Sequence, residues 1–139
     1  MASASKSRKR PEAASPMVLV VDELDAARQM YGHFLGSSGY RVEKAAGSEI
    51  IEKSLALRPD LILMDLAMPG MDGWEAIRRL KSHERTKDSV IIVVTGKAHA
   101  GSAKKAKDAG CDAYLLKPCL PETLLSIVRG LLGRRRSIP

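Results

Sequence analysis

The chain has 139 residues, of which 28% are charged and 45% hydrophobic, a size and composition that suit one globular domain. A domain of this length buries roughly two thirds of its unfolded surface, so it needs neither a metal nor a disulfide to fold. No apolar run approaches the roughly 18 residues that span a bilayer, and the polar, basic start of the chain lacks a signal-peptide core. We therefore expect a cytoplasmic protein without a membrane span. Cys111 and Cys119 are expected to be reduced thiols, with a single disulfide as the alternative.

The net charge of +7 is concentrated at the two ends of the chain. Residues 1–16 and residues 130–139 each carry +3, and the stretch between them is nearly neutral. The first tail is rich in Ser, Ala, Pro, Lys and Arg, a composition that cannot bury enough apolar surface to become ordered. We expect a disordered basic tail over 1–16, a domain over 17–132 and a basic tail over 133–139. The tails are interpreted as solvated ends, with weak contact to nucleic acid, anionic lipid or an acidic partner as the alternative.

Short apolar runs alternate along the chain with segments of helical periodicity. The runs predict strands at Met17–Val21, Arg41–Ala45, Leu61–Met64, 90–94 and Ala113–Leu116. Helices are predicted after each strand, over residues 25–36, 49–57, 73–83, Ser102–Ala109 and 121–132. The apolar stripe of the first helix consists of Ala27, Met30, Tyr31, Phe34 and Leu35.

Five strand–helix repeats with continuously apolar strands indicate an α/β fold with a parallel sheet covered on both faces. Right-handed crossovers determine the hand of each repeat. We expect a doubly wound (βα)5 sheet with the flavodoxin-like strand order 2-1-3-4-5. In such sheets the functional site lies beyond the carboxyl ends of the strands, near the point where the strand order reverses.

The residues that follow the strands share one chemistry. Asp22 and Glu23 follow the first strand, Asp65 the third, Thr95 the fourth and Lys117 the fifth. Clustered carboxylates repel one another and favour an added cation, and Mg²⁺ takes one or two carboxylates together with water and phosphate oxygens. A lysine and a hydroxyl beside them supply a charge and a donor for a phosphoryl group, so the set fits phosphoryl transfer onto an aspartate. Any one of these residues alone could be a helix cap or a solvated strand end. That all four strand ends carry suitable chemistry by chance is much less likely.

Four stretches of the chain together resemble the receiver domain of two-component response regulators, the CheY-like fold. They are VLVVDELDAAR (18–28), PDLILMDLAMPGMDGWE (59–75), VIIVVTGKA (90–98) and AGCDAYLLKP (109–118). The resemblance extends over about residues 17–132. Its most specific element, in combination with the others, is the third strand with the Met-Pro-Gly-Met-Asp-Gly loop that follows it.

The resemblance implies the roles of the site residues. It makes Asp65 the phosphoacceptor, and it makes Asp22 and Glu23 the acidic pair that holds Mg²⁺. Asp65 itself and the backbone carbonyl of Ala67 would complete the protein ligands of the ion. Lys117 would contact the phosphoryl group.

The resemblance also implies a switch. Thr95 would be the switch hydroxyl and Tyr114 the switch aromatic, which turns inward on phosphorylation, and the peptide between Lys117 and Pro118 would be cis. The change would remodel the face formed by the fourth helix, the fifth strand and the fifth helix. That face would then contact a downstream protein target or form a homodimer.

The function implied is that of a stand-alone response regulator, a signalling protein and not an enzyme. It would accept its phosphoryl group from a histidine kinase or a histidine phosphotransfer protein. The residues after 132 are too few for a DNA-binding domain, so a nucleic-acid partner is not expected.

Three positions depart from the family pattern or modify it. Glu23 stands where the second acid is usually aspartate, which puts the metal affinity in question. Ala67 and Lys97 are expected to modulate the rate of dephosphorylation. Two rival hypotheses follow: a docking module that works without phosphorylation, and a receiver whose basic tails bind nucleic acid or a membrane.

Overall fold

The structure is a computed structural model that describes residues 15–67, 70, 72–96 and 101–137. Its strands are β2 (Met17–Val21), β3 (Arg41–Ala45), β4 (Leu61–Met64), β5 (Val90–Thr95) and β6 (Ala113–Leu116). Its helices are α2 (Asp25–Ser37), α3 (Ile50–Leu57), α4 (Gly73–Ser82), α5 (Ser102–Ala109) and α6 (Pro121–Ser137), with a 3₁₀ turn η1 (Gly47–Glu49) before α3.

The strands form one sheet in the order β3-β2-β4-β5-β6, and every neighbouring pair is parallel. Counted along the chain this is the order 2-1-3-4-5, so the predicted (βα)5 fold is confirmed. The order reverses at β2, which pairs with β3 on one side and with β4 on the other. The carboxyl ends of β2 and β4 therefore lie side by side, with Val21 opposite Met64.

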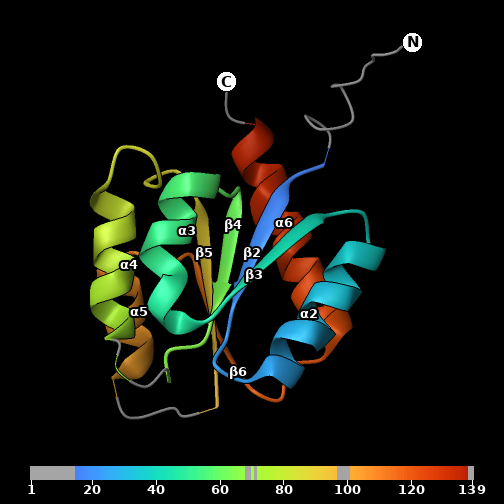
Figure 1. The fold of residues 1–139 in the computed structure, drawn as a ribbon, viewed down its shortest axis with the longest axis horizontal. Helices are drawn as coiled ribbons and strands as arrows, with labels where there is room; N and C mark the ends of the chain where they lie inside the picture. Colours follow the sequence, from blue (N-terminus) through green and yellow to red (C-terminus); the bar gives the residue numbers. More distant parts are fainter. Residues whose placement is uncertain (1–14, 68–69, 71, 97–100, 138–139) are drawn as a thin grey trace.

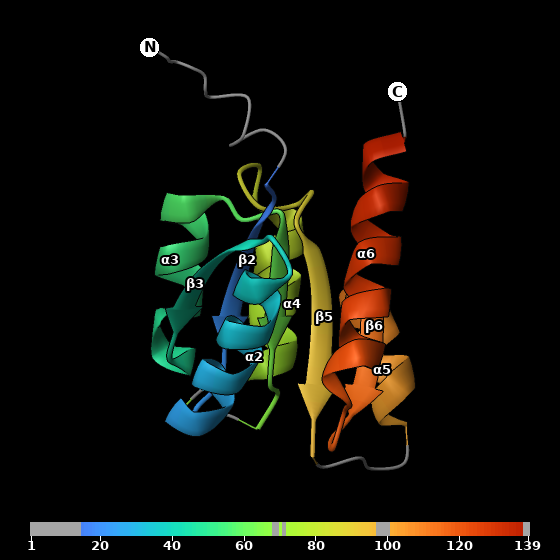
Figure 2. The same cartoon turned by 90° about the vertical axis from the view of Figure 1, so that its right-hand side faces the viewer.

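Helices cover both faces of the sheet, α2 and α6 one face and α3, α4 and α5 the other (Figure 1). Figure 2, turned by 90°, shows α6 running along the sheet on the α2 side. Alternate residues of each strand face opposite helical layers. In β2, Leu19 packs with the α3–α4–α5 layer and Val20 with the α2–α6 layer. This two-sided burial is why β2, β4 and β5 are apolar without alternation.

Two details of the predicted helices are wrong. Met30, assigned to the apolar stripe of the first helix, is 47% exposed, because Tyr31 and Leu35 face the sheet instead. The last helix continues past the expected end at Leu132 to Ser137. Arginine is a good helix former, and cations near a helix C-terminus are stabilised by the helix dipole, so the arginines of the last turns favour this extension.

Within the described residues, no helix combines the length and the apolar character needed to cross a membrane.

Candidate functional site

The carboxyl ends of the parallel strands converge on a single pocket. Its volume is about 440 Å³, and its lining residues come from the loops after β2, β4, β5 and β6: Asp22, Glu23, Leu24, Asp65, Ala67, Gly96 and Lys117. These loops are brought together by the strand order, since Asp22 and Lys117 are far apart in the sequence. The pocket lies at the edge of the sheet where the sequence predicts the functional site.

The centre of the pocket is an ion-pair triad. The ammonium nitrogen Nζ of Lys117 lies 3.0 Å from Oδ2 of Asp22 and 3.0 Å from Oδ2 of Asp65. Both carboxylates are buried, Asp22 at 3% and Asp65 at 8% exposure. Burial acts to lower the pKa of Lys117, but hydrogen bonds and charges from the two carboxylates outweigh it and raise that pKa. Lys117 is therefore a fixed cation between the two acids.

Backbone amides hold the other oxygen of each carboxylate. The amide of Leu24 donates to Oδ1 of Asp22 at 2.9 Å, and the amide of Ala67 donates to Oδ1 of Asp65 at 2.9 Å. In both cases the donor is two residues after the aspartate, so the loop itself orients the acid. In each carboxylate, one oxygen thus accepts a hydrogen bond from its own loop and the other pairs with Lys117.

Arg28 is a site residue that the sequence reasoning missed. From the first turns of α2 its guanidinium donates to the backbone carbonyl of Asp22 and, at 3.4 Å, to that of Glu23. It also forms an ion pair with Asp25 at 3.2 Å. Arg28 therefore ties the acidic loop to the helix that follows it. The available sequence signal was a cation one helical turn after Asp25.

Tyr31 is a second residue near the site that was assigned only to the core. Its side chain is buried at 4% exposure. Burial raises the pKa of its hydroxyl, Lys117 acts in the opposite direction, and the charges of Asp22 and Asp65 raise it further. Tyr31 therefore lies within electrostatic reach of the triad and stays neutral there.

The remaining predicted site residues differ in burial and in their surroundings. Thr95, the last residue of β5, is buried at 1% exposure. Tyr114 of β6 packs against the core cluster of the α3–α4–α5 side, and its hydroxyl is buried without a hydrogen-bond partner in the described part of the chain. Glu23 is exposed at the mouth of the pocket. Lys97 lies outside the described residues.

The peptide between Lys117 and Pro118 is cis, as the resemblance implies. Cys111 and Cys119 are both free, as expected from the sequence.

The donor set fits a hard, partly hydrated cation. Among the described residues no group of three or more His, Cys, Asp or Glu side chains is close enough to hold a metal alone. Asp22 and Asp65 instead present two buried carboxylates, and Glu23 and Ala67 line the same pocket. Mg²⁺ takes one or two carboxylates and keeps several waters, so a site with room for water suits it.

A comparison of the sequence with known protein families identifies the family of this chain. The sequence of residues 18–129 matches the family described as "Response regulator receiver domain". The chain is a member of the response regulator receiver domain family. The receiver match spans all five strands of the sheet, from β2 to β6.

Known relatives and solved structures agree with this membership. The receiver is 34% identical over 125 residues to the "DNA-binding dual master transcriptional regulator RpaA" of Synechocystis, an alignment that covers 89% of this chain and 52% of RpaA. Its fold matches the chemotaxis response regulator CheY4 of Vibrio cholerae with a TM-score of 0.78 and 34% identity, over 84% of this chain and 98% of CheY4.

A second solved structure is relevant to the pocket. The receiver domain of the sensor histidine kinase PA1611 from Pseudomonas aeruginosa matches with a TM-score of 0.77 and 30% identity, over 86% of this chain and 98% of that one. That receiver holds a magnesium ion in its active-site cleft. This chain spans about half the length of the curated relatives that it matches.

Proposed function

We propose that this receiver accepts a phosphoryl group on Asp65 from the phosphohistidine of a histidine kinase or phosphotransfer protein. The observation that carries the proposal is the position of Asp65, a buried carboxylate with one oxygen held by the Ala67 amide and the other at 3.0 Å from the Lys117 ammonium. In the transfer the bond from phosphorus to the imidazole nitrogen breaks as a bond to an Asp65 oxygen forms, and the electron pair leaves with the nitrogen.

The residues around Asp65 have distinct roles in this proposal. Lys117 keeps a positive charge beside the acceptor and pairs with a phosphoryl oxygen after transfer. Asp22, Glu23, Asp65 and the carbonyl of Ala67 would hold Mg²⁺. When bound, that ion neutralises charge on the phosphoryl oxygens. Arg28 keeps the acidic loop in place through its bonds to the carbonyls of Asp22 and Glu23.

The proposed output is a change on the surface around β5 and β6. Thr95, at the end of β5, would donate to a phosphoryl oxygen and be drawn toward Asp65. Tyr114 lies on the neighbouring strand, with Val93 as its register partner. Its hydroxyl is already enclosed here, so phosphorylation would hold this inward side chain in place and would not need to bring it in from solvent.

The proposal makes the protein a cytoplasmic signalling protein and not an enzyme, acting on a downstream protein target. The face of α5, β6 and α6 would carry that contact, with a homodimer through the same face as one form of it. The division into a domain over residues 17–132 flanked by basic tails belongs to the same proposal.

The proposal is tested by measuring the intact mass after incubation with acetyl phosphate, with and without Mg²⁺. We expect the parent to gain one phosphoryl group only with Mg²⁺, and Asp65→Asn to gain none. Asp72→Asn is the matched control, because Asp72 caps α4 from an exposed position near the same loop. It should be phosphorylated like the parent.

Two other outcomes would contradict the proposal. Phosphorylation that persists in Asp65→Asn would place the acceptor elsewhere. No gain in the parent under any condition, together with no binding of a beryllofluoride phosphoryl mimic, would favour the rival hypothesis of a docking module.

A further inference from the structure

Another pocket lies between α4 and α5, which pack beside each other on the same face of the sheet (Figure 1). Its volume is about 350 Å³, and its lining residues are Trp74 and Arg78 of α4 and Lys105 and Asp108 of α5. Side chains that are three or four residues apart in a helix lie on the same face, so each helix presents its pair to the pocket. We call this pocket the α4–α5 groove.

Trp74 gives the groove a firmly held apolar surface. Its side chain packs against the core cluster of the α3–α4–α5 side and is only partly buried, so it also lines the groove. Asp72 fixes the backbone here, because its Oδ1 accepts hydrogen bonds from the amides of Trp74 at 3.0 Å and Glu75 at 3.3 Å. A large aromatic side chain held in this way loses little freedom on binding, and tryptophan is enriched among the residues that dominate interface energies.

The cations of the groove are available to a partner. Lys105 forms no ion pair within the described part of the chain. Arg78 pairs with Glu75 at 3.2 Å, and both side chains are 54% exposed. Asp108 pairs with Lys104 at 2.9 Å, also at an exposed position. Exposed pairs contribute little to stability, so Arg78 can exchange the Glu75 carboxylate for one of a partner at small cost.

Basic charge is concentrated on the two helices that form the groove, each of which has a net charge of +2. Their cations are Arg78, Arg79, Lys81, Lys104, Lys105 and Lys107, and their acids are Glu75 and Asp108. Lys81 is held by Asp112 at 3.2 Å, and the other five cations are exposed. The other described residues between 15 and 133 contain thirteen acidic and nine basic side chains. The surface around the groove therefore attracts an anionic partner, whereas the rest of the domain repels one.

We infer that the α4–α5 groove binds an acidic segment of a protein partner, which places one apolar side chain against Trp74. Carboxylates of the segment pair with Arg78 and Lys105. Asp108 favours a peptide over a nucleic-acid backbone, because a peptide supplies N–H donors for this carboxylate, whereas phosphates supply only acceptors. The inference does not rest on phosphorylation of Asp65, since the groove and the triad pocket share no lining residue among those described.

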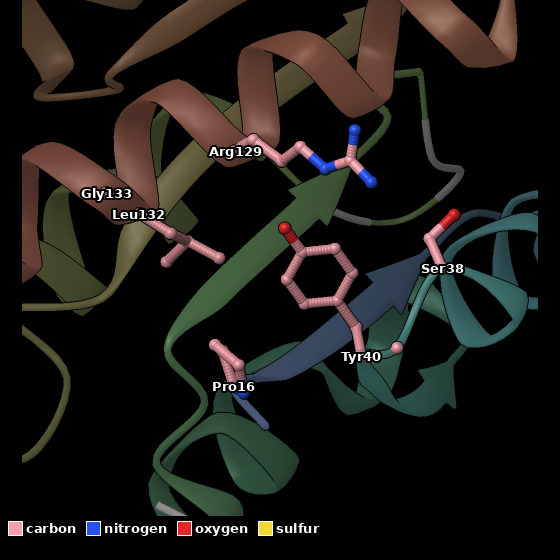
Figure 3. A pocket seen from close by; sticks show the side chains of 7 residues that line it. Pro16, Ser38, Tyr40, Arg129, Leu132 and Gly133 are labelled. Carbon is pink, nitrogen blue, oxygen red and sulfur yellow. The ribbon is translucent and has the colours of Figure 1, made fainter. Parts of the chain in front are cut away.

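The pocket at the amino end of the sheet differs from the groove and offers a control position. Pro16 and Gly133 help to line this pocket of about 260 Å³, and Arg129 is the one charged residue among its described lining residues. In Figure 3 the Arg129 side chain and the Tyr40 hydroxyl extend into the space between α6 and the turn before β3. Since α6 covers the opposite face of the sheet from α4 and α5, Arg129 is remote from the groove.

The test titrates a short synthetic peptide, in which glutamates flank one phenylalanine, into the isotope-labelled full chain. Trp74 is the only tryptophan in the sequence, so its indole N–H signal in NMR spectra reports on the groove directly. We expect a saturable shift of this signal. A peptide with glutamines in place of the glutamates, or with alanine in place of the phenylalanine, should bind about tenfold more weakly. Added salt should also weaken binding, because it screens exposed charges.

Two double variants that each remove one arginine and one lysine separate the groove from general charge. Arg78→Gln/Lys105→Gln should weaken binding of the glutamate peptide about tenfold, and since both side chains are exposed, urea unfolding should show an intact fold. Lys87→Gln/Arg129→Gln removes the same charge at exposed positions outside the groove and should bind like the parent. No phosphoryl donor is present, so the outcome is separate from that of the mass measurement.

Several results would overturn the inference. It fails if the indole signal does not shift, if the glutamine peptide binds as tightly as the glutamate peptide, or if the control variant loses as much affinity as the groove variant. Oligothymidylate that shifts the signal when the glutamate peptide does not would overturn it in favour of nucleic acid. A dimer of the free chain in sedimentation velocity that Arg78→Gln/Lys105→Gln abolishes would overturn it in favour of a second copy.

Discussion

Nζ of Lys117 and Oδ2 of Asp65 lie 3.0 Å apart, although 52 residues separate them in the sequence. The contact brings the end of β6 to the end of β4 across β5, which lies between them in the sheet. Since Lys117 also bonds Asp22 at 3.0 Å, one ammonium neutralises two buried acids. The triad thus joins the ends of β2, β4 and β6. Its charge balance depends on Lys117 alone.

Replacing Lys117 by methionine should destabilise the fold by about 2 kcal/mol at neutral pH, because two buried carboxylates would then face each other without a cation. Since the pKa of Lys117 is raised above its ordinary value near 10.5, its stabilising contribution is complete below that pH and is lost as the pH rises further. The difference between parent and Lys117→Met in urea unfolding should therefore shrink above pH 10.5.

The control for this variant is Lys104→Met. Lys104 pairs with Asp108 at 2.9 Å, but both side chains are largely exposed, so its loss should change stability by less than about 0.5 kcal/mol. An equal loss in the two variants would contradict the role assigned to Lys117.

Alanine substitutions at two helical glycines should have opposite effects. A Cβ on Gly73 would lie 2.7 Å from Cδ2 and 3.3 Å from Cα of Leu66, the residue after Asp65. Gly73→Ala should cost about 1–2 kcal/mol and slow phosphorylation, because Leu66 must move. Gly130 in α6 has open space around it, so Gly130→Ala should stabilise by about 0.5–1 kcal/mol. Urea unfolding of both variants checks the signs, and a neutral Gly73→Ala would refute the close contact.

Two buried serines should also respond differently to alanine. The hydroxyl of Ser54 in α3 is buried without a partner in the described part of the chain, whereas Ser89 donates to the Pro59 carbonyl at 2.6 Å. Ser54→Ala should raise the free energy of unfolding by about 1 kcal/mol, because it removes an unpaired buried hydroxyl. Ser89→Ala should lower it by about 1–2 kcal/mol. Calorimetric melting that moved both variants in the same direction would contradict this assignment.

Cys111 should resist alkylation in the native protein. Burial, together with the nearby charge of Asp112, raises the pKa of the Cys111 thiol to about 11. The reactive thiolate is therefore scarce at pH 8, and its fraction should rise about tenfold per pH unit up to that value. Iodoacetamide labelling followed by peptide mass analysis should show slow modification in the native state and fast modification in urea. Equal rates in the two states would exclude a protected thiol.

The site residues at the strand ends were predictable from the sequence because the fold obeys a local pattern. Four strongly apolar strands and a weaker one at Arg41–Ala45 alternate with helices, and such a chain forms a parallel sheet whose carboxyl ends meet. Asp22, Asp65 and Lys117 could thus be placed at one edge before any contact was known. The errors arose where the packing of neighbouring side chains determines which residue is buried. Met30 fits the helical period, yet Tyr31 and Leu35 occupy the face of α2 that packs on the sheet.

The sequence alone therefore determined the element types, the strand order and the edge at which the acids and the lysine gather. Periodicity identifies the five strand–helix repeats, and a doubly wound sheet of such repeats has the flavodoxin-like order with its site at the carboxyl ends. Only the tertiary structure decided that Lys117 bridges both acids, and that Arg28 holds the acidic loop. It alone brought Pro16 and Gly133 to the lining of one pocket. Distances between residues remote in sequence depend on how helices pack on the sheet, which no local pattern specifies.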